Sequence, residues 1–440
     1  MKKLILTLLI CVYASAFAQA QTWDELDRKG MKLFYDNKHE QAFLVLEQAK
    51  TQAEKEFGKT NTSYATACFH LALSYESQNL YPKAELLQIE SKNVREKLLG
   101  KEHRDYAESC GRLAMLYKTQ ATYTKAEPLY IEAKNIYEKL SGKNNLDYAT
   151  ACTDLANLYL TQGFYTKAEA LYIEARNVFG QIFGQNHPNY AGNCNSLAAL
   201  YDAQGLYAKA EPLYLEAKDI YGKIFGQNHP NYANACNNLA VLYMNQKMYG
   251  KATTLLLESK DIYEKAFGNG HPVYGGICNN IGLLYVEQKL YTKAEPFYIE
   301  GKDIQEKIFG KEHPDYALCC NNMSVLYKEL KQYDKAESLC LEGKNIREKV
   351  LGKKHPYYAL SCNNLADIYS AQGLYAKATP LYLEAKDIRE KVLGKAHPDY
   401  AITCENMAEM YKKQGLTSKA SALSKEAESS RKMATKKNKL

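Results

Sequence analysis

The chain carries little net charge in its main body, although its total charge is positive. It has 57 basic and 50 acidic residues, for a formal net charge of +7. Two of the basic residues lie in 1–20 and five in 431–440, where there is no acid, so residues 21–430 hold 50 residues of each sign. A nucleic-acid-binding protein is expected to show a basic stripe. We therefore expect no nucleic-acid partner.

The sequence also lacks the short motifs of the common enzyme classes. It contains no G-x-S-x-G, H-E-x-x-H or P-loop motif, and no G-x-G-x-x-G in a strand–turn–helix context. No polar residue stands apart from the regular pattern described below as a candidate for chemistry. We expect no enzymatic activity, no catalytic residue and no cofactor.

Long apolar runs are absent except near the amino end. Residues 4–12 are apolar, follow two lysines and precede small residues that end in Ala18-Gln19-Ala20. This is the pattern of a secretory signal peptide, and the run is too short for a permanent membrane span. Residues 1–20 are predicted to direct export to the periplasm or the extracellular space, with cleavage after Ala18 or Ala20. Cys11 is not preceded by the small residue that a lipidation motif requires, so a lipid anchor is the less favoured interpretation.

What the sequence has in abundance is internal repetition, with a period of 42 residues. A Gly recurs nine times at this step, from Gly58 to Gly394, and an Ala recurs ten times. The ten are Ala42, Ala84, Ala126, Ala168, Ala210, Ala252, Ala294, Ala336, Ala378 and Ala420. Self-similarity at a fixed step of this size indicates a solenoid of stacked units.

Each unit is predicted to form two antiparallel helices. In the unit at 355–396, one stripe of the first helix is formed by Tyr358, Cys362, Leu365, Ala366 and Tyr369. Pro356 suits the first position of that helix, and Gly394 suits the end of the second. No alternating strand pattern competes. The predicted fold class is all-α, an α-solenoid or superhelix of about ten helix-turn-helix pairs.

The motifs of the unit resemble a known family. L-A-x-x-Y in the first helix and K-A-x-x-x-Y-x-x-A in the second are similar to the tetratricopeptide repeat. The 42-residue period, the H-P-x-Y-A opening and C-N-N-L-A resemble the repeats of kinesin light chain, here in a secreted bacterial form. The resemblance implies a scaffold for protein–protein interaction. It covers about 22–430, and the units depart from it only near the ends.

The predicted division of the chain follows from these patterns. Residues 1–20 form the signal peptide, 21–430 the solenoid and 431–440 a basic carboxyl-terminal tail. The helix pairs are predicted to start near 22, 61, 103, 145, 187, 229, 271, 313, 355 and 397.

Cysteine and histidine each recur at one position of the repeat. Nine of the twelve cysteines lie on the apolar stripe, at Cys68, Cys110, Cys152, Cys194, Cys236, Cys278, Cys320, Cys362 and Cys404. Neighbouring helices stand roughly 8–10 Å apart, too far for a disulfide, so we expect buried free thiols. Only Cys319 and Cys340 leave a pairing open. Six histidines open first helices, one in each unit, and one per unit cannot supply the three or four ligands of a metal site. They are predicted to be structural and are His187, His229, His271, His313, His355 and His397.

An asparagine run lies beside the apolar stripe of the first helices. It consists of Asn195, Asn237, Asn279, Asn321 and Asn363, followed by a second series that includes Asn238, Asn280, Asn322 and Asn364. An asparagine presents both donors and acceptors. By the resemblance, these residues line a concave groove that binds an extended peptide. The alternative is a ladder that only ties neighbouring units together, and the sequence does not decide between them.

We therefore expect an exported scaffold that binds a protein or peptide partner of unknown identity. A second interpretation is a regulatory or sensor partner of a separate catalytic component, such as a CHAT-type protease system, because similar secreted arrays often precede such a domain. Glycan binding by the tyrosines is less favoured, because 31 of the 37 occupy four repeat positions that suit packing.

Overall fold

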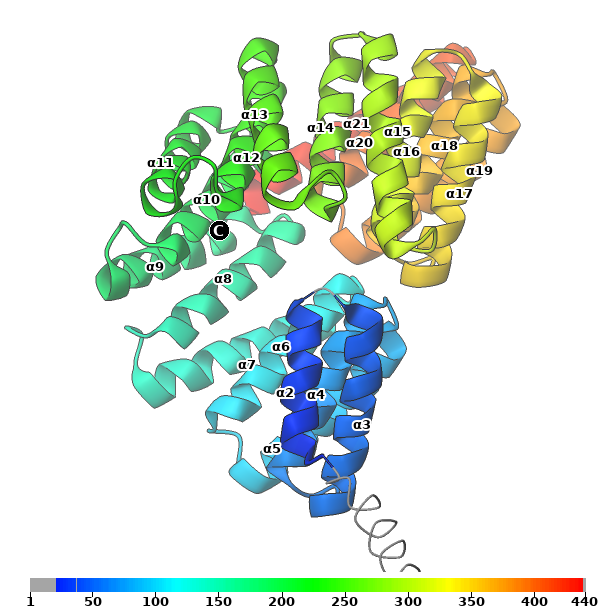
Figure 1. Cartoon of the computed structure of the whole chain (residues 1–440). Helices are drawn as coiled ribbons and strands as arrows, with labels where there is room; N and C mark the ends of the chain where they lie inside the picture. Colours follow the sequence, from blue (N-terminus) through cyan, green and yellow to red (C-terminus); the bar gives the residue numbers. More distant parts are fainter. Residues whose placement is uncertain (1–20, 37, 438–440) are drawn as a thin grey trace, which may run out of the picture. The chain divides into compact units, whose positions relative to one another are not determined.

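The computed structural model describes residues 21–36 and 38–437, and it is helical throughout. The described residues form 20 helices in ten successive antiparallel pairs and no strand (Figure 1). The predicted fold class, an all-α solenoid of helix pairs, is confirmed. The predicted signal peptide and Cys11 lie outside the described residues.

The two helices of each pair have nearly constant lengths along the chain. The first helices are α2 (Trp23–Tyr35), α4 (Thr62–Ser77), α6 (Arg104–Thr119), α8 (Leu146–Thr161), α10 (Pro188–Ala203), α12 (Pro230–Asn245), α14 (Pro272–Glu287), α16 (Pro314–Glu329), α18 (Pro356–Ala371) and α20 (Pro398–Lys413). The second helices are α3 (His39–Phe57), α5 (Tyr81–Leu99), α7 (Tyr123–Ser141), α9 (Tyr165–Phe183), α11 (Tyr207–Phe225), α13 (Tyr249–Phe267), α15 (Tyr291–Phe309), α17 (Tyr333–Leu351), α19 (Tyr375–Leu393) and α21 (Thr417–Lys437). The last helix thus continues into the basic segment 431–440.

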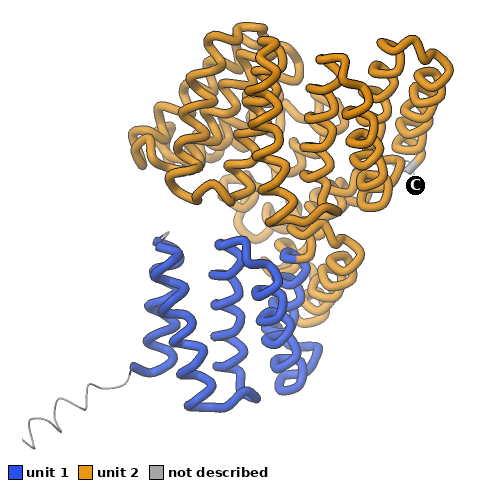
Figure 2. Tube along the Cα trace, turned by 90° about the vertical axis from the view of Figure 1, so that its right-hand side faces the viewer, with its two compact units in different colours: residues 1–116 blue, residues 117–440 orange. Residues whose placement is uncertain are grey.

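The chain forms two compact units, residues 1–116 and 117–440 (Figure 2). Within unit 2, each first helix packs against its own second helix and against the second helix of the preceding pair. Consecutive first helices are also in contact; for example, α14 contacts α16, and α16 contacts α18. Consecutive second helices make sparser contact. First helices therefore lie on the inner side of unit 2, and second helices on its outer side.

Histidine starts the later first helices, as predicted. The Nδ1 atom of His229 accepts a hydrogen bond from the backbone N–H of Asn231 at 3.1 Å, and the ring stacks on Phe225 with 4.5 Å between centroids. Asn145 performs the same capping role at the start of α8, where it accepts from the backbone N–H of Tyr148. A side-chain acceptor at this position satisfies a backbone donor that the helix itself leaves unpaired.

The core between the helices is made largely of tyrosine, alanine and cysteine. Tyr358, Ala359 and Cys362 are almost fully buried within one pair. All eleven described cysteines are buried thiols that form no disulfide, Cys319 and Cys340 among them. The packing interpretation of the cysteine series is confirmed, and the pairing left open for Cys319 and Cys340 does not form.

Candidate functional site

The asparagine run lies between consecutive first helices of unit 2, and part of it forms a ladder. The Nδ2 atom of Asn280 donates to Oδ1 of Asn237 at 2.9 Å. Asn364 donates to Asn321 in the same way at 3.4 Å, and Asn406 continues the series by donating to Asn363 at 3.5 Å. Each bond joins one first helix to the next. Some of the predicted binding residues therefore already use hydrogen-bonding groups to hold neighbouring units together.

Asn279, Asn321 and Asn363 are buried rather than open to a ligand, with exposed fractions of 5, 1 and 3%. The Nδ2 atoms of the first two donate to the backbone carbonyl four residues earlier, at 3.2 and 2.9 Å. Asn279 also lies 2.8 Å from the sulfur of Cys319. These amides are part of the packing between helices.

A glycine in the facing second helix makes room for two of these buried amides. A Cβ atom on Gly343 would lie 2.6 Å from Nδ2 of Asn321, and one on Gly301 would lie 3.0 Å from Nδ2 of Asn279. At the same position of other pairs the chain has alanine, as in Ala217 and Ala385. In these two pairs the amide of the asparagine occupies space that a methyl group on the facing residue would need.

Asn195, Asn237, Asn238 and Asn322 remain partly exposed on the inner side. The Oδ1 atom of Asn195 accepts no hydrogen bond from any described residue. No side-chain hydrogen bond joins Asn238 or Asn322 to another described residue. Asn238 and Asn322, rather than the buried amides or Asn195, whose Oδ1 atom is itself buried, keep hydrogen-bonding capacity available for a partner.

A cleft of about 380 Å³ lies at the carboxyl end of the run, between the ends of α16, α18 and α20. Its walls carry three lysines and three acids, namely Lys328, Lys331, Lys413, Glu329, Asp367 and Glu409. Asp367 accepts from the hydroxyl of Tyr382 and from the amides of Asn363 and Asn406. The asparagine run therefore leads into a cleft with charged walls.

Asp367 was missed by the reasoning from sequence, although a signal was present. The same position of the repeat holds Leu73, Met115, Asn157, Ala199, Val241, Leu283, Val325 and Glu409 in the other pairs. Asp367 therefore breaks a column that is mostly apolar. Burial raises the pKa of its carboxyl, while the Tyr382 hydroxyl and the nearby lysines lower it. Comparison of all units at this one position would have identified it.

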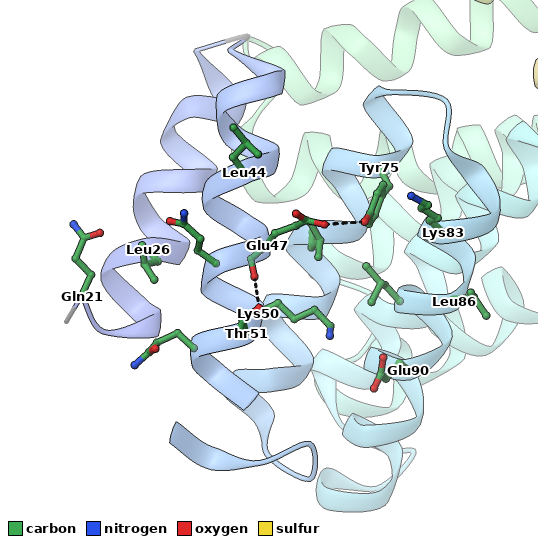
Figure 3. Close-up of a pocket in the computed structure, with 14 residues that line it drawn as sticks. Gln21, Leu26, Leu44, Glu47, Lys50, Thr51, Tyr75, Lys83, Leu86 and Glu90 are labelled. Atoms are coloured by element: carbon green, nitrogen blue, oxygen red, sulfur yellow. Dashed lines mark hydrogen bonds between the residues drawn. The ribbon is translucent and has the colours of Figure 1, made fainter. Parts of the chain in front are cut away.

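A larger hollow, of about 990 Å³, lies in unit 1 on helices α2 to α5 (Figure 3). Leu44 and Leu86 are 59 and 69% exposed beside it. The hydroxyl of Tyr75 donates to Glu47 at 3.2 Å within it, as the dashed line in Figure 3 shows. None of the predicted site residues lies here. The hollow offers apolar surface with charged side chains at its margin.

The described residues show neither a metal-binding cluster nor a membrane-spanning helix. In 21–36 and 38–437, no three or more His, Cys, Asp or Glu side chains gather as metal ligands would. In the same ranges, no helix combines the length and the apolar character that crossing a membrane requires.

Comparison with protein-family models finds one description, the tetratricopeptide repeat. One model of this family matches residues 149–221, 192–265, 277–342, 321–391 and 361–433, and a second matches 65–105 and 107–147. The matches of the first model alone span more than half of the chain. No curated protein matches the sequence.

Solved structures share the fold at low sequence identity. A Rap protein complexed with Competence and Sporulation Factor is 14% identical, with a TM-score of 0.58, over 85% of this chain and 99% of that chain. Aspartyl phosphate phosphatase F from Bacillus subtilis is 16% identical, with a TM-score of 0.50, over 83 and 94%. BtubC (BKLC) from P. vanneervenii is 23% identical, with a TM-score of 0.42, over 54 and 92%.

Proposed function

Because the chain belongs to the tetratricopeptide repeat family, we propose that the inner side of unit 2 binds an extended segment of a protein partner. Stacked repeats present long inner surfaces that suit such binding. The observation that carries the proposal is the pair Asn238 and Asn322, which keep their hydrogen-bonding groups for a partner. An amide side chain can both donate to and accept from a peptide backbone.

The fold supports a scaffold rather than an enzyme, since tetratricopeptide arrays are typically non-catalytic. A Rap protein with the same fold is complexed with Competence and Sporulation Factor, which supports ligand binding on such an array. A second candidate function is regulation of a separate catalytic component. The same likeness favours it, because a binding array can act by holding a regulatory ligand.

The inner-side proposal is tested by replacing two partly exposed asparagines whose side chains form no hydrogen bond with another described residue. Asn238→Ala and Asn322→Ala together should leave the melting temperature unchanged and weaken partner binding about tenfold to a hundredfold, since each hydrogen bond contributes about 0.5–1.5 kcal/mol. The measurement is quantitative affinity capture with the full chain as bait, followed by titration of the captured partner. The matched control is Asn135→Ala with Asn177→Ala, two exposed asparagines on second helices.

Unchanged partner affinity in the Asn238/Asn322 variant would contradict binding on the inner side. Equal weakening in the Asn135/Asn177 control would do the same, because it would place the partner on the outer side. The buried residues Asn279, Asn321 and Asn363 are left intact in this design, so a loss of binding cannot arise from disrupted packing.

We also propose that the protein is exported, on the basis of the signal-like pattern in residues 1–20. The mature chain should then begin at Gln19 or Gln21. Intact mass of the protein from its native cells checks this. A retained Met1, or a lipid adduct on Cys11, would contradict it.

A further inference from the structure

A cavity of about 420 Å³ lies on unit 2 between α8, α10 and α12, away from the Asp367 cleft. Its lining includes Asp154 and Thr153 from α8, Asn193 from α10, and the rings of Phe179 and Tyr221 from the second helices. The described residues of this lining include one acid and no lysine or arginine. The cavity therefore differs in charge from the cleft at the other end of the asparagine run, whose lining holds three lysines and three acids.

Asn193 is the polar side chain that the fold leaves unsatisfied in this lining. Its exposed fraction is 1%, and its Oδ1 atom accepts no hydrogen bond from a described residue. Its Nδ2 atom donates to Oγ1 of Thr153 at 3.1 Å. Because Thr153 gives its own hydroxyl proton to the carbonyl of Ala149 at 3.0 Å, Thr153 can only accept from Asn193. The orientation of the amide is thus determined, and the unpaired atom is an acceptor.

Tyr221 and Asp154 also present acceptors, whereas the side-chain amides of Asn189 and Asn231 in the lining can both donate and accept. The hydroxyl of Tyr221 donates to the carbonyl of Pro188 at 3.4 Å, which leaves its oxygen free only to accept. An ionised carboxylate such as Asp154 can only accept. Lys118 and Tyr172 also face Asp154. Burial lowers the pKa of Lys118 and raises that of Tyr172, and the charge of Asp154 raises the pKa of both groups. Neither of these two residues lines the cavity.

Two residues of the cavity, Asn193 and Asp154, differ from the residues that other units carry at the same repeat positions. In the other first helices from α4 to α20, the position of Asn193 holds small or apolar residues or a hydroxyl, namely Ala67, Ser109, Ala151, Ala235, Ile277, Cys319, Ser361 and Thr403. The position of Asp154 holds no other acid in α4 to α20; it holds His70, Arg112 and Ser196 in three units and an asparagine in Asn238, Asn280, Asn322, Asn364 and Asn406. Packing alone needs neither exception, because the other pairs form the same helices without them.

We propose that this cavity binds the guanidinium group of an arginine in the partner segment. A guanidinium has five donors and no acceptor, which complements the acceptors of Asn193 and Tyr221 and the carboxylate of Asp154. It also stacks on aromatic rings, which favours arginine over the compact ammonium of lysine, and Phe179 and Tyr221 supply such rings. This inference rests on the proposed binding of a peptide segment to the inner side.

The test uses the full chain and three labelled heptapeptides, Ac-Ala-Ala-Ala-X-Ala-Ala-Ala-amide, in which X is arginine, citrulline or glutamate. Citrulline has the shape of arginine without its charge. Fluorescence anisotropy should show the arginine peptide binding at least about tenfold more tightly than the citrulline peptide, since hydrogen bonds between charged groups are the stronger kind. The glutamate peptide should bind most weakly.

Two variants test whether the cavity is responsible for the preference for the arginine peptide over the citrulline peptide. Asp154→Asn and Asn193→Ala should each reduce the preference for arginine over citrulline about tenfold or more. Each introduces the residue that other pairs already carry at that position, so the melting temperature should stay close to that of the wild type. Asn193→Ser is the second variant if the alanine protein is unstable. Asn135→Ala on α7 is the control and should leave the preference unchanged.

Equal affinity for the arginine and citrulline peptides would overturn the proposal, and so would variants with an unaltered preference. Absence of binding by the arginine peptide at millimolar concentration would also overturn it. None of these results bears on the inner-side proposal, because that proposal has its own test, the capture of the partner by the Asn238/Asn322 variant.

Discussion

At the scale of the residue, the informative positions are those where one unit departs from the others. Asp367 occupies a position that is apolar in most units, and its carboxylate accepts the hydroxyl of Tyr382. In α8 the equivalent residue is Asn157, which accepts the hydroxyl of Tyr172 at 2.6 Å. The shared function is to satisfy a buried tyrosine hydroxyl, and an amide performs it without a charge.

Asp367→Asn should therefore stabilise the protein at neutral pH. Burial raises the pKa of Asp367 above its ordinary value, so the folded state disfavours the ionised form. The wild type gains stability as the pH falls through this raised pKa and loses it as the pH rises. We expect the variant to be more stable by about 1 kcal/mol at pH 8, with a gain that shrinks as the pH approaches 4.

Urea denaturation of both proteins between pH 4 and pH 8 measures this difference. Asn157→Asp is the reciprocal change and should destabilise the protein at pH 8 for the same reason. A constant difference between the wild type and Asp367→Asn across the pH range would contradict the assignment of a raised pKa.

At the scale of the element, the pairing of asparagine with glycine shows how one helix adjusts to another. Asn321 in α16 and Gly343 in α17 meet at a position where other second helices carry alanine, as in Ala217 and Ala385. A methyl group on Gly343 would also approach the backbone carbonyl of Ala317 at 2.9 Å. Because backbone cannot move as a flexible side chain can, the helices themselves would have to separate.

Gly343→Ala should therefore destabilise the protein by about 1–3 kcal/mol through overpacking. The matched control is Gly250→Ala in α13, where an added Cβ atom meets no atom within 4 Å. That change should stabilise by about 0.5–1 kcal/mol, because alanine favours the helix over glycine. Chemical denaturation of both variants measures the two effects, and a stabilised Gly343→Ala would contradict the close packing described above.

At the scale of the whole molecule, one histidine contact within unit 2 links distant parts of the sequence. The Nε2 atom of His355 lies 3.0 Å from the backbone carbonyl of Thr119, 236 residues earlier. Its Nδ1 atom accepts from the backbone N–H of Tyr357 at 3.1 Å. Burial lowers the pKa of His355 to about 4. The neutral ring therefore donates to Thr119 while it caps α18.

His355→Asn should keep the helix cap and lose the distant hydrogen bond, since asparagine caps α8 at the equivalent position. We expect a loss of about 1 kcal/mol in the free energy of unfolding and faster hydrogen exchange near Thr119. The control is His271→Asn, which changes a histidine that caps α14 and makes no such distant bond. Equal losses in the two variants would show that the contact with Thr119 contributes nothing.

The sequence by itself determined the fold class, because each unit contains the full local pattern for two helices. The stripe of Tyr358, Cys362 and Leu365, the histidine caps and the 42-residue step are all properties of short stretches of chain. They predict helix pairs that cannot bury their apolar faces alone and must stack on their neighbours. The burial of the free cysteines followed from the same reasoning.

Only the tertiary structure decided how the asparagine run divides between packing and available surface. Asn279 and Asn322 belong to the same predicted set, yet one is buried beside Gly301 and the other keeps its amide exposed. The difference depends on the contacts between successive first helices and on the residue that faces each amide from a second helix. Those neighbours lie about 20 to 43 residues away in the chain, so the periodicity within one helix cannot reveal them. The same reason explains why the acceptors around Asn193 become visible as one cavity only after the helices are packed.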